Sequence, residues 1–195
     1  MSEARDITEH LIEEGTAARA HFQVWLALRN LAVQRLLPAM NDLSYVDFFH
    51  ASNSGHYKLF FIALSKIFDR DQRVAGISEL KKTLRADGRT DLALYIAREL
   101  KPVEKLIVRM MRIRNKSIAH TERRMPRTQV YKINGITPNQ IRQVIDQVCS
   151  VINHVATDLG ISNTIFESDR LEKATLRMLE TLRRGQLVTK FQKNK

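Results

Sequence analysis

Apolar side chains recur at steps of three and four residues along most of the chain, which is the spacing of one face of an α-helix. The first such series, with Leu11 and Phe22 on one face, predicts a long amphipathic helix that ends before Pro38. A second, strongly apolar helix is expected to open at Tyr57, after the polar segment SNSG. The predicted helices after the first span residues 57–68, 77–84, 91–100, 103–119, 138–159 and 169–184.

Signals that start and stop helices are clearest in the second half of the chain. Thr137 followed by Pro138 is typical of a helix N-terminus, because a threonine side chain accepts from free backbone N–H groups and proline has none to satisfy. Before it, the turn-forming Asn134-Gly135 favours a loop over 121–135, with a small hairpin at about 128–136. The chain has only 7 Gly and 4 Pro, which argues against turn-rich sandwiches and barrels. We therefore predict an all-α fold.

The chain of 195 residues is long enough for one domain with its own core. We find no linker, and predict a single domain over residues 1–187 with a basic, frayed tail at 188–195. The N-terminus lacks the basic start and apolar stretch of a secretory signal, and the apolar runs are too short to span a membrane. The single cysteine, Cys149, cannot form an internal disulfide. These features favour a cytoplasmic protein that does not contact a membrane.

Basic residues outnumber acidic ones by 32 to 21, and most of the excess lies in one segment. Residues 98–132 hold 11 basic and 3 acidic side chains. A local surplus of that size attracts polyanions, so RNA, DNA or a nucleotide is the first partner to consider. The alternative is an ordinary solvated helix face.

The helix predicted at 103–119 carries the most informative pattern in the chain. On a helical wheel its apolar residues fall on one arc of about 160°, and Arg114 lies in the middle of that arc. A guanidinium buried there must be paired and hydrogen-bonded, because an unpaired buried charge destabilises the fold. A second face carries a basic stripe that leads to a histidine and consists of Lys105, Arg109, Arg112, Lys116 and His120.

Each of these residues also has a purely structural interpretation. Arg114 would then form a salt bridge inside the fold, for which Asp69 or Asp71 in the segment FDRD is the candidate carboxylate. His120 would be a residue placed favourably against the helix dipole at the C-terminal end of its helix. The FDRD acids could also hold Mg²⁺, but two carboxylates at a helix end are more often a cap or ion-pair partners.

The string RNKSIAH at residues 114–120 resembles the signature of the HEPN superfamily (higher eukaryotes and prokaryotes nucleotide-binding domains), which places an Arg and a polar residue a short spacer before a His. The segments FFIALSKIFDRD at 60–71 and NGITPNQIRQVIDQV at 134–148 are similar to its abortive-infection U-type (AbiU-like) branch. The resemblance covers about residues 5–160. It implies a helical bundle with a four-helix up-and-down core plus extra helices, which dimerises by bringing two such motifs together.

For active members, the resemblance further implies a metal-independent endoribonuclease without a cofactor, often a toxin or phage-defence effector. Arg114 and His120 point about 120° apart on a straight α-helix and lie about 9 Å apart along its axis, so one helix is a poor active site. A two-fold axis between two copies would supply the missing half. The expected catalytic residues are Arg114, Asn115 and His120. The expected RNA contacts are Lys105, Arg109, Arg112, Lys116 and the loop residues Arg123, Arg124 and Arg127.

A second class of function stays open on the residues alone, namely a non-catalytic bundle that binds RNA, a nucleotide or a partner protein through the same basic helix. The histidines lack the spacing of a zinc site, and no Gly-rich phosphate loop occurs. His120 is followed by Thr121-Glu122, not by the His-x-Tyr continuation of the branch that nucleotidyltransferase partners neutralise. That partner is therefore not expected, whereas an antitoxin or regulator of another kind stays open.

Overall fold

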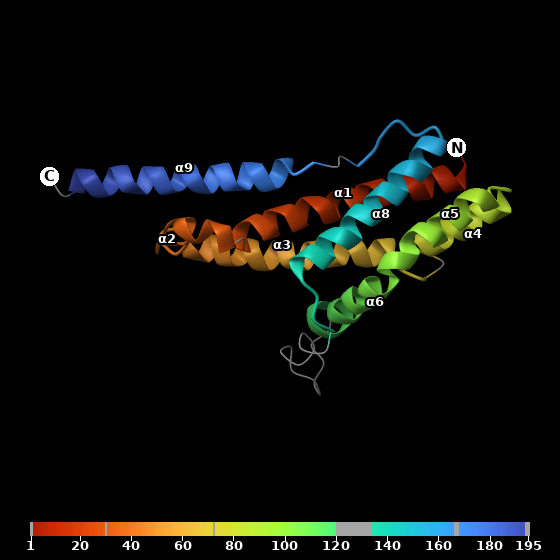
Figure 1. Ribbon diagram of the computed structural model, residues 1–195, viewed down its shortest axis with the longest axis horizontal. Coiled ribbons are helices and arrows are strands. Elements are labelled where there is room, and N and C mark those ends of the chain that lie inside the picture. Colours follow the sequence, from red (N-terminus) through yellow and green to blue (C-terminus); the bar gives the residue numbers. More distant parts are fainter. Residues whose placement is uncertain (1, 30, 72, 120–133, 166–167, 194–195) are drawn as a thin grey trace. The chain divides into compact units, whose positions relative to one another are not determined.

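The computed structural model describes residues 2–29, 31–71, 73–119, 134–165 and 168–193, with the backbone alone at 31–33, 117–119 and 187–193. Every regular element in these ranges is a helix, which confirms the predicted all-α class (Figure 1). Most of the predicted hairpin at 128–136 falls outside them. The helices are α1 (Glu3–Arg29), the 3₁₀ segment η1 (Leu31–Leu36), α2 (Leu37–Met40), α3 (Val46–Ile67), α4 (Ile77–Ala86), α5 (Thr90–Leu100), the 3₁₀ segment η2 (Lys101–Val103), α6 (Glu104–Ile113), the π-helical segment η3 (Arg114–Ala119), α8 (Pro138–Asp158) and α9 (Arg170–Lys193).

The start of α3 differs from the sequence prediction. The pattern predicts a helix that opens at Tyr57, but α3 begins at Val46 and includes the polar segment at residues 52–55. A glycine inside a helix costs about 1 kcal/mol relative to alanine. Phe49 offsets that cost, because its side chain is buried in an apolar cluster, and full burial of a phenylalanine stabilises by about 1.5–3 kcal/mol. Tertiary packing therefore outweighs the local preference of the segment.

The end of the chain also differs, because α9 continues to Lys193 where the pattern predicts an end at residue 184. Leu179 is fully buried, and Leu182 packs against the same cluster as Phe49. One turn later, Gln186 Nε2 donates to Ala39 O at 3.4 Å, which ties α9 to α2 beyond the predicted end. Residues 188–193 of the predicted tail are thus helical.

The chain divides into two compact units, and the first comprises residues 1–19 and 59–167. Its helix α8 buries apolar side chains along its whole length, and α5 and α6 pack against it. Gly15 of α1 lies against the side chain of Ile165, and a Cβ at Gly15 would force the end of that side chain to shift. Cys149 is buried beside it, with its Sγ 3.8 Å from Gly15 O, and therefore acts as a small apolar group.

The predicted N-terminus of α8 is confirmed in detail. Thr137 Oγ1 accepts from the backbone N–H of Gln140 at 3.3 Å, and Gln140 Oε1 accepts from the backbone N–H of Thr137 at 3.0 Å. This capping box satisfies two backbone donors that the first turn leaves without helical partners, and Pro138 follows at the first helical position.

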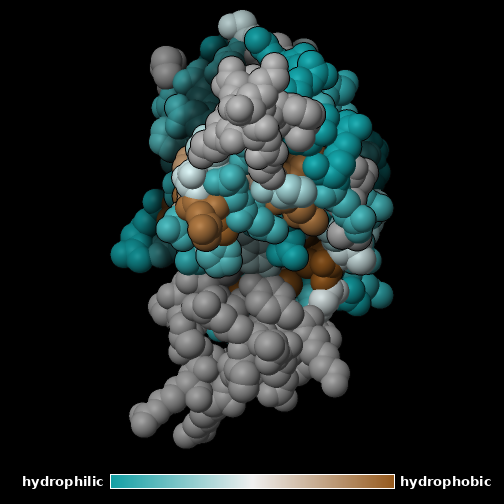
Figure 2. Space-filling view, turned by 90° about the vertical axis from the view of Figure 1, so that its left-hand side faces the viewer, coloured by the Kyte–Doolittle hydropathy of each residue, from teal (hydrophilic) through white to brown (hydrophobic). Residues whose placement is uncertain are grey.

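The second unit comprises residues 20–58 and 168–195. Gln23 fixes the start of α9, since its Nε2 donates to Ser168 O at 2.6 Å and its Oε1 accepts from Leu171 N at 3.1 Å. Apolar side chains remain on the surface around the start of α3, where Leu43 in the preceding turn is 94% exposed and Phe48 in the first turn of α3 is 63% exposed. Figure 2 faces the side on which α2 lies in Figure 1, and brown apolar patches interrupt its teal polar surface.

Two histidines of this unit, His21 on α1 and His56 on α3, face each other with their Nδ1 atoms 2.9 Å apart. One ring must donate a proton and the other accept it, so the contact requires at least one neutral ring. Burial lowers the pKa of His21, and burial together with the neighbouring His21 lowers the pKa of His56. Among the described residues, no group of three or more His, Cys, Asp or Glu side chains is arranged to hold a metal ion, and the histidine pair therefore has no third ligand.

We expect this pair to make the stability of the protein depend on pH. Folding lowers the pKa of both histidines, so the unfolded chain binds more protons than the folded one at acidic pH. The free energy of unfolding is therefore unaffected by the pair above the ordinary histidine pKa of about 6.5, and it decreases as the pH falls below that value. Urea midpoints measured between pH 7 and pH 5 should therefore decrease. His56→Gln should flatten that decrease, whereas His10→Gln at an exposed position of α1 should not. A midpoint of the parent chain that stays constant from pH 7 to pH 5 would contradict the prediction.

None of the helices in the described ranges combines the length and the apolar character that crossing a membrane requires.

Candidate active site

The segment that carries the predicted motif is anchored by buried apolar residues. Met110 and Ile113 are fully buried, and their helix α6 packs against α8. Val103, just before α6, is also buried. These contacts confirm that one face of the predicted helix belongs to the core. They also fix the end of α6, and therefore the place of Arg114, which follows it directly.

The helix predicted over 103–119 changes type within the motif. It is α-helical only to Ile113, and residues 114–119 form the π-helical segment η3. A π-helix bonds residue i to i+5 and has a wider turn than the 3.6 residues of an α-helix. The angles of an α-helical wheel therefore apply only as far as Ile113. Single π-helical turns of this kind occur frequently at functional sites.

Arg114 and Asn115 meet directly at the start of η3. Arg114 Nη1 donates to Asn115 Oδ1 at 2.9 Å, and the arginine residue is half-buried, not buried as its place in the middle of the apolar arc predicts. Its Nε is buried and has no hydrogen-bond partner among the residues that the structure describes. The guanidinium is nevertheless a permanent positive charge, and such a group binds oxygens of anionic ligands well.

Arg114 and Asn115 line a pocket of about 680 Å³ in the first unit. Helices α3, α4, α5 and α6, the 3₁₀ segment η2 and the segment after α3 supply the rest of the lining. The apolar part of the lining includes Phe68, Ile107 and Met111. The charged part consists of five cations and two carboxylates, namely Arg70, Lys81, Lys101, Arg112, Arg114, Asp69 and Glu104.

The two acidic residues of the FDRD segment have different surroundings. The carboxylate of Asp71 binds Arg73, with Oδ2 2.6 Å from Nη2, and this hydrogen bond holds the pKa of Asp71 below its usual range. Asp69 accepts from the backbone N–H of Asp71 at 2.9 Å and lines the pocket beside Arg114. Within the described ranges, neither carboxylate forms the predicted ion pair with Arg114, which binds Asn115 instead.

The basic stripe divides between the pocket and the surface. Arg112 is exposed and lines the pocket, whereas Lys105 and Arg109 are exposed outside its lining. Lys116 is half-buried. The remaining predicted site residues lie outside the described ranges, and these are His120, Arg123, Arg124 and Arg127.

Sequence reasoning missed several cations of the pocket. Lys81 and Lys101 come from α4 and η2, and Arg70 from the segment after α3. The position of Lys81 could have been predicted, because it lies four residues after the buried Ile77 and therefore on the same face of α4. The others depend on tertiary arrangement, which no local pattern encodes.

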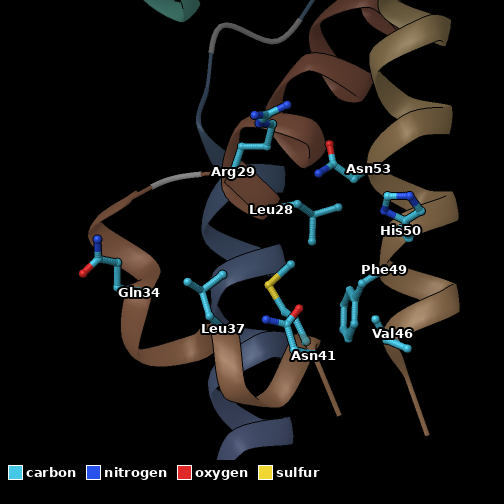
Figure 3. Close-up of a pocket in the computed structure, with 10 residues that line it drawn as sticks. Leu28, Arg29, Gln34, Leu37, Asn41, Val46, Phe49, His50 and Asn53 are labelled. Carbon is cyan, nitrogen blue, oxygen red and sulfur yellow. The ribbon is translucent and has the colours of Figure 1, made fainter. Parts of the chain in front are cut away.

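A second pocket, of about 350 Å³, lies in the second unit between α1, α2 and α3. Figure 3 shows Arg29, Asn53 and His50 towards one end and the apolar Leu37 and Val46 towards the other. It contains none of the predicted site residues.

Comparison with known proteins supports the resemblance found in the motif. Residues 1–174 match the family model HEPN_AbiU2, described as AbiU2. Neither a curated protein nor a solved structure matches the chain. The match covers most of the chain, including the motif at 114–120 and the helices that position it, and the chain therefore belongs to the AbiU2 family of HEPN proteins.

Proposed function

We propose that the protein is a metal-independent endoribonuclease that acts as an abortive-infection effector. The observation that carries the proposal is the pair Arg114–Asn115, fixed by a 2.9 Å hydrogen bond at the wall of a pocket rich in cations. The AbiU2 family match over residues 1–174 supports the same role. A positive pocket beside an exposed basic helix favours a polyanionic substrate such as RNA.

The reaction begins with attack of a ribose 2′-hydroxyl on the adjacent phosphorus. His120 accepts the proton of that hydroxyl, and His120 of a second subunit donates a proton to the leaving 5′-oxygen. Arg114 stabilises the negative charge that develops on the phosphorane, and Asn115 orients a phosphate oxygen or an imidazole. The products are a 2′,3′-cyclic phosphate and a free 5′-hydroxyl.

Two subunits are part of the proposal because the reaction needs both a base and an acid. One chain supplies a single His120, whereas a two-fold axis beside the motif brings two copies of it to one cleft. Arg114 is half-buried, and its hydrogen bond to Asn115 holds the guanidinium close to the protein surface. The two-fold axis must therefore pass close to this part of the surface.

The test is cleavage of a labelled single-stranded RNA in the presence of EDTA. We expect fragments that end in a 2′,3′-cyclic phosphate, and no cleavage at a linkage whose 5′-side ribose is replaced by 2′-deoxyribose. Cleavage that requires a divalent cation, or that proceeds through the deoxy linkage, would contradict the mechanism. Salt-sensitive RNA binding that survives His120→Ala, with no fragments from the parent chain, would instead indicate the non-catalytic bundle.

A further inference from the structure

The pocket beside Arg114 is larger than a phosphate group needs. Its volume of about 680 Å³ falls within the range of about 300–1,000 Å³ that is typical of pockets for small organic ligands. Phe68, from the segment after α3, and Ile107 and Met111, both on α6, give it a wall of apolar side chains. A patch that only attracts phosphate does not need such a wall, whereas a ligand with a flat apolar body does.

The charges of the lining favour an anionic ligand. Five cations face two carboxylates, and one of these carboxylates, that of Glu104, already pairs with Lys101 at 3.0 Å. Asp69 accepts from the backbone N–H of Asp71. The lining therefore has a surplus of three positive charges, and Arg114 is one of the cations. A nucleotide carries both required features, an apolar aromatic face and a phosphate.

We propose that this pocket is a base-accepting subsite, which takes one unpaired nucleotide of the RNA next to the phosphate that Arg114 binds. The inference rests on the proposed function and names the form of substrate that the site accepts. The base lies against the apolar wall, where Phe68 offers a ring for stacking, and its phosphate meets Arg112 and Arg114.

The subsite selects single-stranded RNA for a geometric reason. A base inside a helix is stacked on both faces and paired along one edge, so it cannot enter a pocket until it leaves the helix. Cations on the protein surface, such as Lys105 and Arg109 outside the pocket, attract both single strands and duplexes. The difference between the affinities for single-stranded and double-stranded RNA therefore depends on the pocket and not on the overall charge.

Two matched pairs of variants test the subsite. Ala97 lines the pocket at an exposed position of α5, so Ala97→Trp places an indole in the pocket without disturbing the core. Leu94→Trp adds the same ring to α5 at an exposed position outside the lining. Lys81→Gln removes a cation that lines the pocket, and Lys82→Gln removes its neighbour, which pairs with Glu79 at 3.0 Å.

The probe is a labelled 2′-O-methyl RNA hexanucleotide, whose blocked 2′-oxygens prevent cleavage, and fluorescence anisotropy reports its Kd. We expect Ala97→Trp to weaken binding about tenfold, since stacking of one base contributes about 1–3 kcal/mol. Leu94→Trp should stay within about twofold of the parent chain, and Lys81→Gln should weaken binding more than Lys82→Gln. The same hexanucleotide in a duplex should bind about tenfold less tightly than the single strand.

The outcomes separate this inference from the proposed function. If Ala97→Trp binds the single strand as the parent does, or if duplex and single strand bind equally, the subsite is wrong even where cleavage still depends on His120. If Ala97→Trp loses binding but the parent produces no fragments, the subsite stands and the nuclease proposal fails. Absence of binding by the parent chain would overturn the subsite as well.

Discussion

Replacing His120 with alanine is expected to slow RNA cleavage by about 10²–10⁴-fold, because each active dimer loses both its general base and its general acid. Arg114→Ala should cost about 10²–10³-fold through lost stabilisation of the phosphorane. Initial rates on a labelled single-stranded RNA in EDTA measure both effects. His10→Ala and Arg85→Ala, at exposed positions of α1 and α4 outside the site, should retain the rate of the parent chain.

Mixing the two proteins tests whether the site is shared. After subunit exchange, an equal mixture of parent and His120→Ala chains contains about one quarter of dimers with both histidines. If each active site needs both, the mixture retains about a quarter of the parent activity, whereas sites within single subunits would retain about half. A rate that His120→Ala leaves unchanged would remove the histidine from the mechanism.

Removing buried volume beneath the motif should cause a large loss of stability. Ile113 is fully buried and directly precedes Arg114, so Ile113→Ala leaves a cavity that costs about 2–5 kcal/mol in the free energy of unfolding. Val108 lies on the same helix and is 39% exposed, and Val108→Ala should cost less than about 1 kcal/mol. Urea unfolding followed by circular dichroism measures both values.

The comparison of these two variants has a clear negative outcome. Equal losses of stability would mean that α6 does not present Ile113 to the core, and the direction assigned to Arg114 would fail with it. A large loss in Ile113→Ala alone supports the anchoring of the motif by α8.

Local signals in the sequence were sufficient where they act over a few residues. The helix start at Thr137 and the place of Pro138 at the first helical position follow from spacing and residue type, and both are found in the structure. The place of Arg114 on an apolar arc predicted a buried guanidinium, and this was met in part, because the residue is half-buried. Each of these predictions depends on neighbours within one or two helical turns.

Predictions failed where distant contacts decide the outcome. Residues 52–55 are poor helix formers, yet they lie inside α3 because Phe49 is buried against residues far away in the sequence. The hydrogen bond between Arg114 and Asn115 lies at a change of helix type that hydrophobic periodicity does not reveal. The cations of the pocket from α4 and η2 are brought to Arg114 by tertiary packing alone.

The change of helix type at residues 114–119 also makes the motif sensitive to insertion and deletion. A turn closed by i to i+5 bonds holds one residue more than a turn closed by i to i+4 bonds. Loss of one residue from this stretch would let the backbone continue as an ordinary α-helix, but it would rotate everything that follows by about 100°. For the proposed mechanism, the number of residues after Arg114 in this stretch therefore matters as well as which residues they are.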